Sequence, residues 1–203
     1  MLEKQQLASQ LSTLLVEIGK VNLWLVYRGV KPMASIVLTF DWKTDQNRQV
    51  DLSEWLENAN IKYIVSQKFP NTLHISKDIK ILETNKKLEL FDDFESHLQR
   101  GLFYGFPKQA VEAYAKEIIK DKPFPSEIIV FPSLVDEIRS QYWYPYTEYL
   151  VRRGFELEDS LVAKGWADLA REEIPLIAKE FEKDTIEGME ELRLRLLNTN
   201  TYQ

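Results

Sequence analysis

The sequence predicts an α+β protein, with a mixed sheet and helices in its N-terminal part and a helical layer in its C-terminal part. Apolar, β-rich runs dominate residues 1–86, whereas apolar residues at helical spacing dominate residues 87–203. Strands and helices that are segregated along the chain are typical of α+β folds. We expect a single domain over residues 1–203, because the isolated run at 127–131 should add a strand to the N-terminal sheet.

The first elements alternate between helical and extended patterns. Residues 2–19 repeat leucine and isoleucine along one helical face and end at Gly19, which predicts a helix with a glycine stop. The runs LWLVY (23–27) and ASIVLTF (34–40) are rich in β-branched and aromatic residues. Such residues favour strands, so both runs are predicted to be strands.

The rest of the strand-rich part follows the same logic. TDQNRQ (44–49) is polar and is expected to be a loop before a short helix at 51–60. IKYIV (61–65) and TLHIS (72–76) are predicted to be strands around a loop, and IKIL (79–82) is a further strand candidate.

The helix-rich part contains several amphipathic stripes separated by proline and glycine. The predicted helices lie at 88–102, after Pro107, after Ser133, around Pro145 up to Gly154, at 159–183 and from Ile186 to Leu196. Pro175 falls inside the long stripe and should kink or split it.

Composition limits the class of protein. Hydrophobic residues make up 44% and aromatic residues 12%, so the chain can bury a sizeable core. The net charge is −6, from 26 Lys and Arg against 32 Asp and Glu, which disfavours a nucleic-acid partner. No apolar run is long enough to span a membrane. We therefore expect a cytoplasmic protein with no membrane partner.

Several chemistries are excluded by missing motifs. Cysteine is absent, so the chain has no disulfide, thiolate metal site or cysteine nucleophile. The sequence also contains no P-loop, no Gly-x-Gly fingerprint, no Gly-x-Ser-x-Gly elbow and no His-Glu-x-x-His pair. With 2 histidines far apart, we expect no metal site and no cofactor.

Three polar residues remain as individual candidates. His74 lies in TLHIS and is expected to be a half-exposed strand residue; a catalytic role would require a nearby carboxylate to set its tautomer. His97 follows Asp93 by one helical turn and is expected on a solvated face rather than in a metal site. Asp41 closes an apolar strand, where an acid either binds a ligand or makes a turn.

The stretch YWYPYTEY (142–149) contains five aromatic residues, with Arg139 before it and Arg152 and Arg153 after it. Core, protein interface and ligand site are all open interpretations, and helical spacing favours the core. Trp143, Tyr146, Arg152 and Arg153 are the candidate interface residues, because aromatic residues and arginine are enriched at interfaces.

A corner is expected where two helical stripes meet. Gly101 and Gly105 suit the end of a helix, because glycine accepts a left-handed backbone. Pro107 suits the first turn of the next helix. The local rules leave one feature unexplained, which is the presence of Tyr104 and Phe106 at this corner.

The same corner, GFPKQAVEAY (105–114), resembles a motif of an uncharacterised, largely archaeal family of prokaryotic proteins. In that motif, glycine, an aromatic residue and proline precede Cys-Cys-Val and another aromatic residue. The matching residues are Gly105, Phe106, Pro107, Val111 and Tyr114. Gln109 and Ala110 replace the two cysteines. The resemblance implies a related helical corner without any cysteine chemistry, and it implies no activity.

We expect an intracellular binding or interaction protein without catalytic activity, which associates as a homodimer. Another protein is the alternative partner. The alternative is an enzyme or small-ligand receptor with a pocket between the strand-rich and helix-rich parts. Its candidate residues are Asp41, Arg100, Tyr104, Arg139 and Tyr142. Nucleic-acid binding through the arginines is a third interpretation, which the net charge disfavours.

Overall fold

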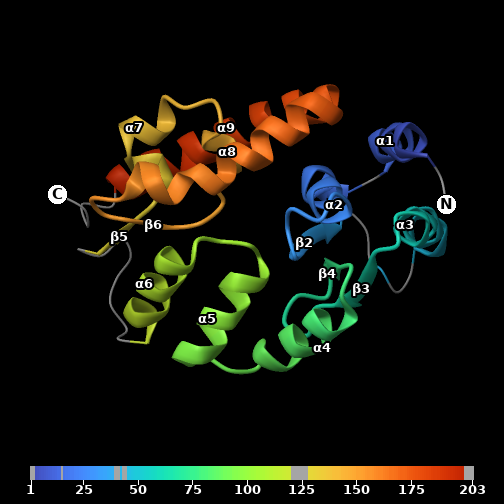
Figure 1. Cartoon of the computed structure of the whole chain (residues 1–203), viewed down its shortest axis with the longest axis horizontal. Coiled ribbons are helices and arrows are strands. Elements are labelled where there is room, and N and C mark those ends of the chain that lie inside the picture. Colours follow the sequence, from blue (N-terminus) through green and yellow to red (C-terminus); the bar gives the residue numbers. More distant parts are fainter. Residues whose placement is uncertain (1–2, 15, 39–41, 43–44, 120–127, 199–203) are drawn as a thin grey trace. The chain divides into compact units, whose positions relative to one another are not determined.

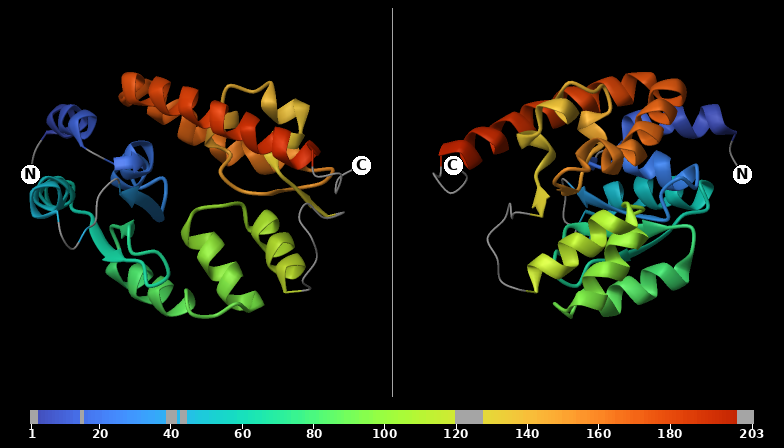
Figure 2. Two further views of the ribbon diagram at one scale, coloured as in Figure 1. Left: turned by 180° about the vertical axis from the view of Figure 1, so that it is seen from behind. Right: turned by 60° about the vertical axis from the view of Figure 1, so that its left-hand side comes forward.

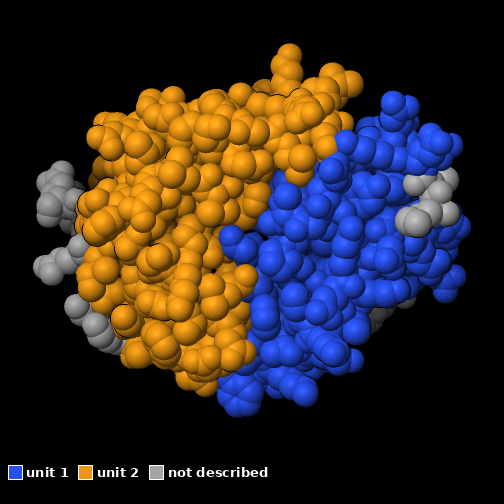
Figure 3. Space-filling view, in the orientation of Figure 1, with its two compact units in different colours: residues 1–92, 103–105 blue, residues 93–102, 106–203 orange. Residues whose placement is uncertain are grey.

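A computed structural model describes residues 3–14, 16–38, 42, 45–119 and 128–198. The chain forms two compact units (Figures 1 and 3). Unit 1 comprises residues 1–92 and 103–105, and unit 2 comprises residues 93–102 and 106–203. The prediction of an α+β fold is confirmed, whereas the single domain stays a prediction.

Unit 1 is a small antiparallel sheet with helices on both faces. Its strands are β1 (Val16–Ile18), β2 (Met33–Leu38), β3 (Lys62–Val65) and β4 (Thr72–Ser76). Its helices are α1 (Lys4–Thr13), α2 (Lys20–Tyr27), α3 (Gln46–Asn58) and α4 (Ile79–Leu88). The strand order is β1-β2-β4-β3, and every neighbouring pair is antiparallel, so the sheet is not the mixed sheet that was expected. The strands β2 and β4 therefore lie in the centre of the sheet, and helices cover their side chains on each face.

The two faces of this sheet have different neighbours. Ile36 of β2 points toward the start of α2, where a Cβ on Gly19 would lie only 2.4 Å from the Ile36 Cγ2. Gly19 also has a φ of 145°, a conformation that side chains rarely adopt, so glycine is needed for this close approach. Ser35 and His74 point to the opposite face, where α4 packs against β3 and β4 (Figure 1).

Unit 2 is mainly helical. Its elements are α5 (Phe94–Phe103, whose last residue counts with unit 1), α6 (Lys108–Ile118), β5 (Ile129–Val130), η1 (Pro132–Leu134), α7 (Asp136–Arg139), η2 (Tyr144–Tyr146), β6 (Val151–Arg152), α8 (Glu156–Glu173) and α9 (Pro175–Asn198). Helices α8 and α9 run side by side (Figure 2). Alanines on α8 and the ring of Trp166 are buried in this unit. Among the described residues, no helix is both long and apolar enough to cross a membrane.

The predicted strand at 23–27 is wrong, because these residues belong to helix α2. Every residue from Val21 to Val26 is buried, including Asn22. A helix that is buried on all sides lacks the alternation between apolar and polar faces that would reveal its period. The β-branched and aromatic composition then favoured the wrong element.

Other boundaries also differ. The strand candidate at 79–82 is the beginning of α4, whose N-cap Asp78 accepts a hydrogen bond from the Lys80 N–H at 2.9 Å. The expected loop at 44–49 lies partly in α3, which begins at Gln46 after the N-cap Asp45. The first helix ends at Thr13 and is followed by β1.

The run at 127–131 does not join the N-terminal sheet. Its described part, β5, pairs with β6 in a separate two-stranded sheet within unit 2. The predicted strands at 61–65 and 72–76 are confirmed as β3 and β4. Pro175 splits the long C-terminal stripe, because α8 ends before it and α9 starts at it.

Candidate functional site

His74 occupies the centre of the sheet in unit 1. It lies on β4 opposite Ser35 of β2 and Ile64 of β3, so all three side chains share one face of the sheet. Its side chain is buried, with 3% of its surface exposed. The expectation of a half-exposed strand residue is therefore wrong, because α4 covers this face.

Glu89 supplies the carboxylate that a functional histidine requires. It follows the last residue of α4 as the C-cap, and only 1% of its surface is exposed. The carboxylate accepts hydrogen bonds from the Ser66 hydroxyl at 2.9 Å and from the Gln67 N–H at 3.1 Å. Burial raises the pKa of Glu89, but the bonds from Gln67, His74 and Ser66 outweigh this effect and hold the pKa below its ordinary value of 4.5.

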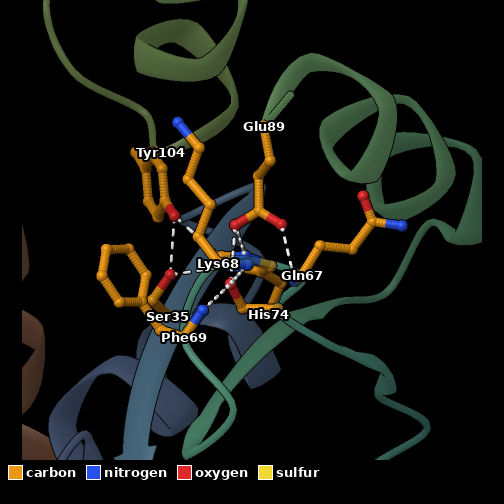
Figure 4. A network of polar contacts seen from close by, with 8 residues as sticks. Ser35, Gln67, Lys68, Phe69, His74, Glu89 and Tyr104 are labelled. Carbon is orange, nitrogen blue, oxygen red and sulfur yellow. Dashed lines mark hydrogen bonds and ion pairs between the residues drawn. The ribbon is translucent and has the colours of Figure 1, made fainter. Parts of the chain in front are cut away.

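Tyr104, Ser35, His74 and Glu89 form one chain of hydrogen bonds, which we call the polar relay (Figure 4). The Tyr104 hydroxyl lies 2.6 Å from Ser35 Oγ, and Ser35 Oγ lies 2.8 Å from His74 Nδ1. His74 Nε2 lies 2.5 Å from Glu89 Oε1.

The direction of the relay follows from its inner end. An ionised carboxylate only accepts hydrogen bonds, so His74 Nε2 must carry a hydrogen and donate it to Glu89. In the neutral imidazole, Nδ1 is then the acceptor and receives the Ser35 O–H. Ser35 is closer to Nδ1 than Tyr104 is, at 2.8 Å against 3.4 Å, so its proton is assigned to Nδ1 and the Tyr104 phenol donates to Ser35 Oγ.

The relay leads from the buried carboxylate toward the protein surface. His74 and Glu89 are buried, whereas Ser35 and Tyr104 are half-buried. Phe69, which is 60% exposed, lies beside Ser35 and Tyr104, and the exposed Lys68 lies close to them (Figure 4). The outer end of the relay is therefore bordered by the aromatic ring of Phe69 and the cationic side chain of Lys68.

Only one of the residues expected to form a ligand site belongs to the relay, and that residue is Tyr104. Asp41 lies outside the described residues. Arg100, Arg139 and Tyr142 belong to unit 2. Arg139 pairs with Asp136 and Glu190, and the Tyr142 hydroxyl donates to Asp168.

The aromatic stretch 142–149 is mainly core of unit 2. Four of its rings are buried, namely Trp143, Tyr144, Tyr146 and Tyr149, while Tyr142 is 37% exposed. Trp143 donates to Ser160 at 3.1 Å, and Tyr146 donates to Glu182 at 3.1 Å. Burial raises the pKa of Tyr144 to about 12 and raises the pKa of Tyr146 still further.

The arginines that flank this stretch have different surroundings. Arg152 pairs with the buried Asp159, with 2.8 Å between Nη2 and Oδ1, while Arg153 is exposed. Trp143 and Tyr146, which were expected as interface residues, are buried within unit 2 itself.

Sequence reasoning missed Ser35 and Glu89 and discounted His74. The first two carry no motif, and their meeting depends on strand register and on where α4 ends. The one available signal was His74 itself, a histidine in an apolar strand that required a carboxylate partner.

The fold and site together define a small α+β protein in which hydrogen bonds join a serine to a histidine and the histidine to a glutamate. Within the described part of the chain, no three metal-binding side chains gather at one place. No protein-family model, curated protein or solved structure matches the chain.

Proposed function

We propose that this chain catalyses serine-dependent acyl transfer, with the hydrolysis of a small ester as its simplest form. A nucleophile, a base within hydrogen-bond reach and a third group that orients the base are the parts of such a site. Ser35 is the nucleophile, His74 the base and Glu89 the orienting acid. The continuous chain from Ser35 Oγ to Glu89 Oε1 through the His74 ring carries the proposal.

In the first step, Ser35 Oγ forms a bond to the carbonyl carbon of the ester, and the carbonyl π electrons move to its oxygen. The Ser35 proton passes to His74 Nδ1, and the Glu89 carboxylate stabilises the resulting imidazolium. The carbon–oxygen bond to the alcohol then breaks, and the alcohol leaves with the proton from His74. Water releases the acid from the acyl-serine by the same steps, so His74 and Ser35 are regenerated.

The test combines turnover with covalent labelling. Purified protein is assayed with p-nitrophenyl acetate and butyrate and is treated with a fluorophosphonate probe, followed by peptide mass spectrometry. We expect the label on Ser35, and we expect Ser35→Ala to lower hydrolysis by about a thousandfold or more. Ser53→Ala, at a half-buried serine of α3 outside the relay, is the matched control.

Two results would count against the proposal. Hydrolysis that persists in Ser35→Ala at the wild-type rate would place the activity elsewhere. A folded wild-type protein that neither turns over the esters nor takes the label at Ser35 would leave the relay with a structural role alone, as a support for the 66–71 loop and β2.

A second candidate is a non-enzymatic interaction protein that forms a homodimer in the cytoplasm. It is favoured by exposed apolar side chains on α8 and α9, among them Leu161 at 52%, Leu176 at 83% and Leu194 at 56%. Large apolar surfaces on soluble proteins commonly mark interfaces. Sedimentation at micromolar concentration tests the dimer, and a mass near the 23.9 kDa of one chain would contradict it.

A further inference from the structure

Tyr104 reaches the relay from an unusual place in the chain. Residues 103–105 belong to unit 1, although the residues on both sides of them belong to unit 2. Gly105 has a φ of 77°, so it ends α5 in the left-handed conformation expected of a C-terminal glycine. This short corner brings one phenol to the half-buried end of the relay.

The distances around Tyr104 favour one role for its hydroxyl at rest. Its hydroxyl lies 2.6 Å from Ser35 Oγ and 3.4 Å from His74 Nδ1. Because the Ser35 proton already points to Nδ1, the phenol donates to Ser35 Oγ. The relay thus directs a proton donor at the atom that would form the new bond.

We propose that Tyr104 is a catalytic residue, which donates a hydrogen bond to the carbonyl oxygen of the substrate as negative charge develops there. This inference rests on the proposed function. A positioned donor that is already directed at the reacting centre costs little reorganisation during the reaction. A phenol is also a stronger acid than an aliphatic hydroxyl, so it is well suited to stabilise an oxyanion.

The exchange of partners is balanced. Ser35 Oγ uses an electron pair to bond the carbonyl carbon, and its proton moves to His74 Nδ1. The carbonyl oxygen gains the π electrons and becomes the better acceptor, so the Tyr104 O–H turns from Ser35 to that oxygen. Tyr104 keeps its own proton throughout, and it returns to Ser35 when the acyl group leaves.

The first experiment measures the hydrolysis of p-nitrophenyl butyrate by Tyr104→Phe, which keeps the ring but removes the donor. We expect kcat to fall about a hundredfold to a thousandfold with little change in KM. Tyr63→Phe is the matched control, because Tyr63 of β3 pairs with Ile75 and so lies on the other face of the sheet from His74. We expect it to keep wild-type kcat.

The second experiment replaces Tyr104 with a fluorotyrosine, which preserves the hydroxyl and lowers its pKa. We expect the alkaline limb of the kcat profile to move to lower pH, since the donor is lost when the phenol ionises. A structural role for the ring would leave this limb in place. This variant also keeps the test decisive if Tyr104→Phe does not fold.

The outcomes separate the two proposals. If Ser35→Ala abolishes hydrolysis but Tyr104→Phe is as fast as the wild type or faster, Tyr104 merely covers Ser35 and the inference is overturned. If Ser35→Ala keeps wild-type activity, the proposed function is overturned, and the inference on Tyr104 is overturned with it, independently of the result for Tyr104→Phe.

Discussion

The polar relay of unit 1 and the aromatic stretch of unit 2 are two ways to bury polar atoms. In the relay, each group depends on the next, from Tyr104 through Ser35 and His74 to Glu89. In the aromatic stretch, the rings that make hydrogen bonds have separate partners, as Trp143 has Ser160 and Tyr146 has Glu182.

The two regions show that a conspicuous sequence pattern does not by itself mark a functional site. Five aromatic residues within eight positions attract attention, yet most of these rings fill a core. A linked network has the stronger consequences, because removing one member leaves its neighbours buried without partners. The two regions should therefore respond differently to substitution.

The largest expected effect is that of Glu89→Ala. We expect the free energy of unfolding to fall by about 3–5 kcal/mol, because Ser66, Gln67 and His74 lose a shared buried acceptor. Chemical denaturation measures the change. Glu83→Ala, at an exposed position of the same helix, should change it by less than about 0.5 kcal/mol. Equal losses for the two variants would show that Glu89 supports no network.

A smaller effect is expected in the aromatic stretch. Tyr146→Phe removes one hydrogen bond to Glu182 and leaves the ring in the core, so we expect a loss of about 1–2 kcal/mol. Denaturation of the single variants and of Tyr146→Phe with Trp143→Phe tests independence. The two losses should nearly add, and strong coupling between them would remove the contrast with the relay.

The corner that carries Tyr104 should be sensitive at both glycines, for different reasons. Gly105→Ala places a side chain at a φ of 77°, and we expect a loss of about 1 kcal/mol. Gly101→Ala would bring a Cβ within 2.4 Å of the Val111 Cγ1, so its loss should shrink when Val111 is shortened to Ala. No such rescue is expected for Gly105→Ala. Thermal unfolding of Gly101→Ala and Gly105→Ala, each alone and combined with Val111→Ala, checks both statements.

The smallest effect is a change in acid sensitivity. The pKa of Glu89 is lower in the folded state than its ordinary 4.5, so its contribution to stability is complete above that pH and is lost as the pH falls through the lower, folded-state pKa. Glu89→Gln should therefore flatten the fall in stability below pH 4.5. A parallel pH dependence in both proteins would mean that Glu89 has no lowered pKa.

The sequence predicted the fold class but not the arrangement that forms the site. β-Branched residues identified β3 and β4, and the glycine and proline at 105–107 identified the corner. The error at 79–82 mattered most, because a strand there leaves one face of the sheet open, whereas the helix α4 covers His74 and ends at Glu89. Strand register and helix ends depend on packing across the unit, which local patterns do not contain.

The most direct test of the relay is the position of the hydrogen on the His74 ring, read by nitrogen NMR of protein that carries labelled histidine. His97, the other histidine of the chain, serves as the internal reference. In the neutral form of the ring, we expect the hydrogen on Nε2, and Glu89→Gln should weaken this preference. A hydrogen on Nδ1 with a bare Nε2 would contradict the account, because His74 could then neither donate to Glu89 nor accept the proton of Ser35.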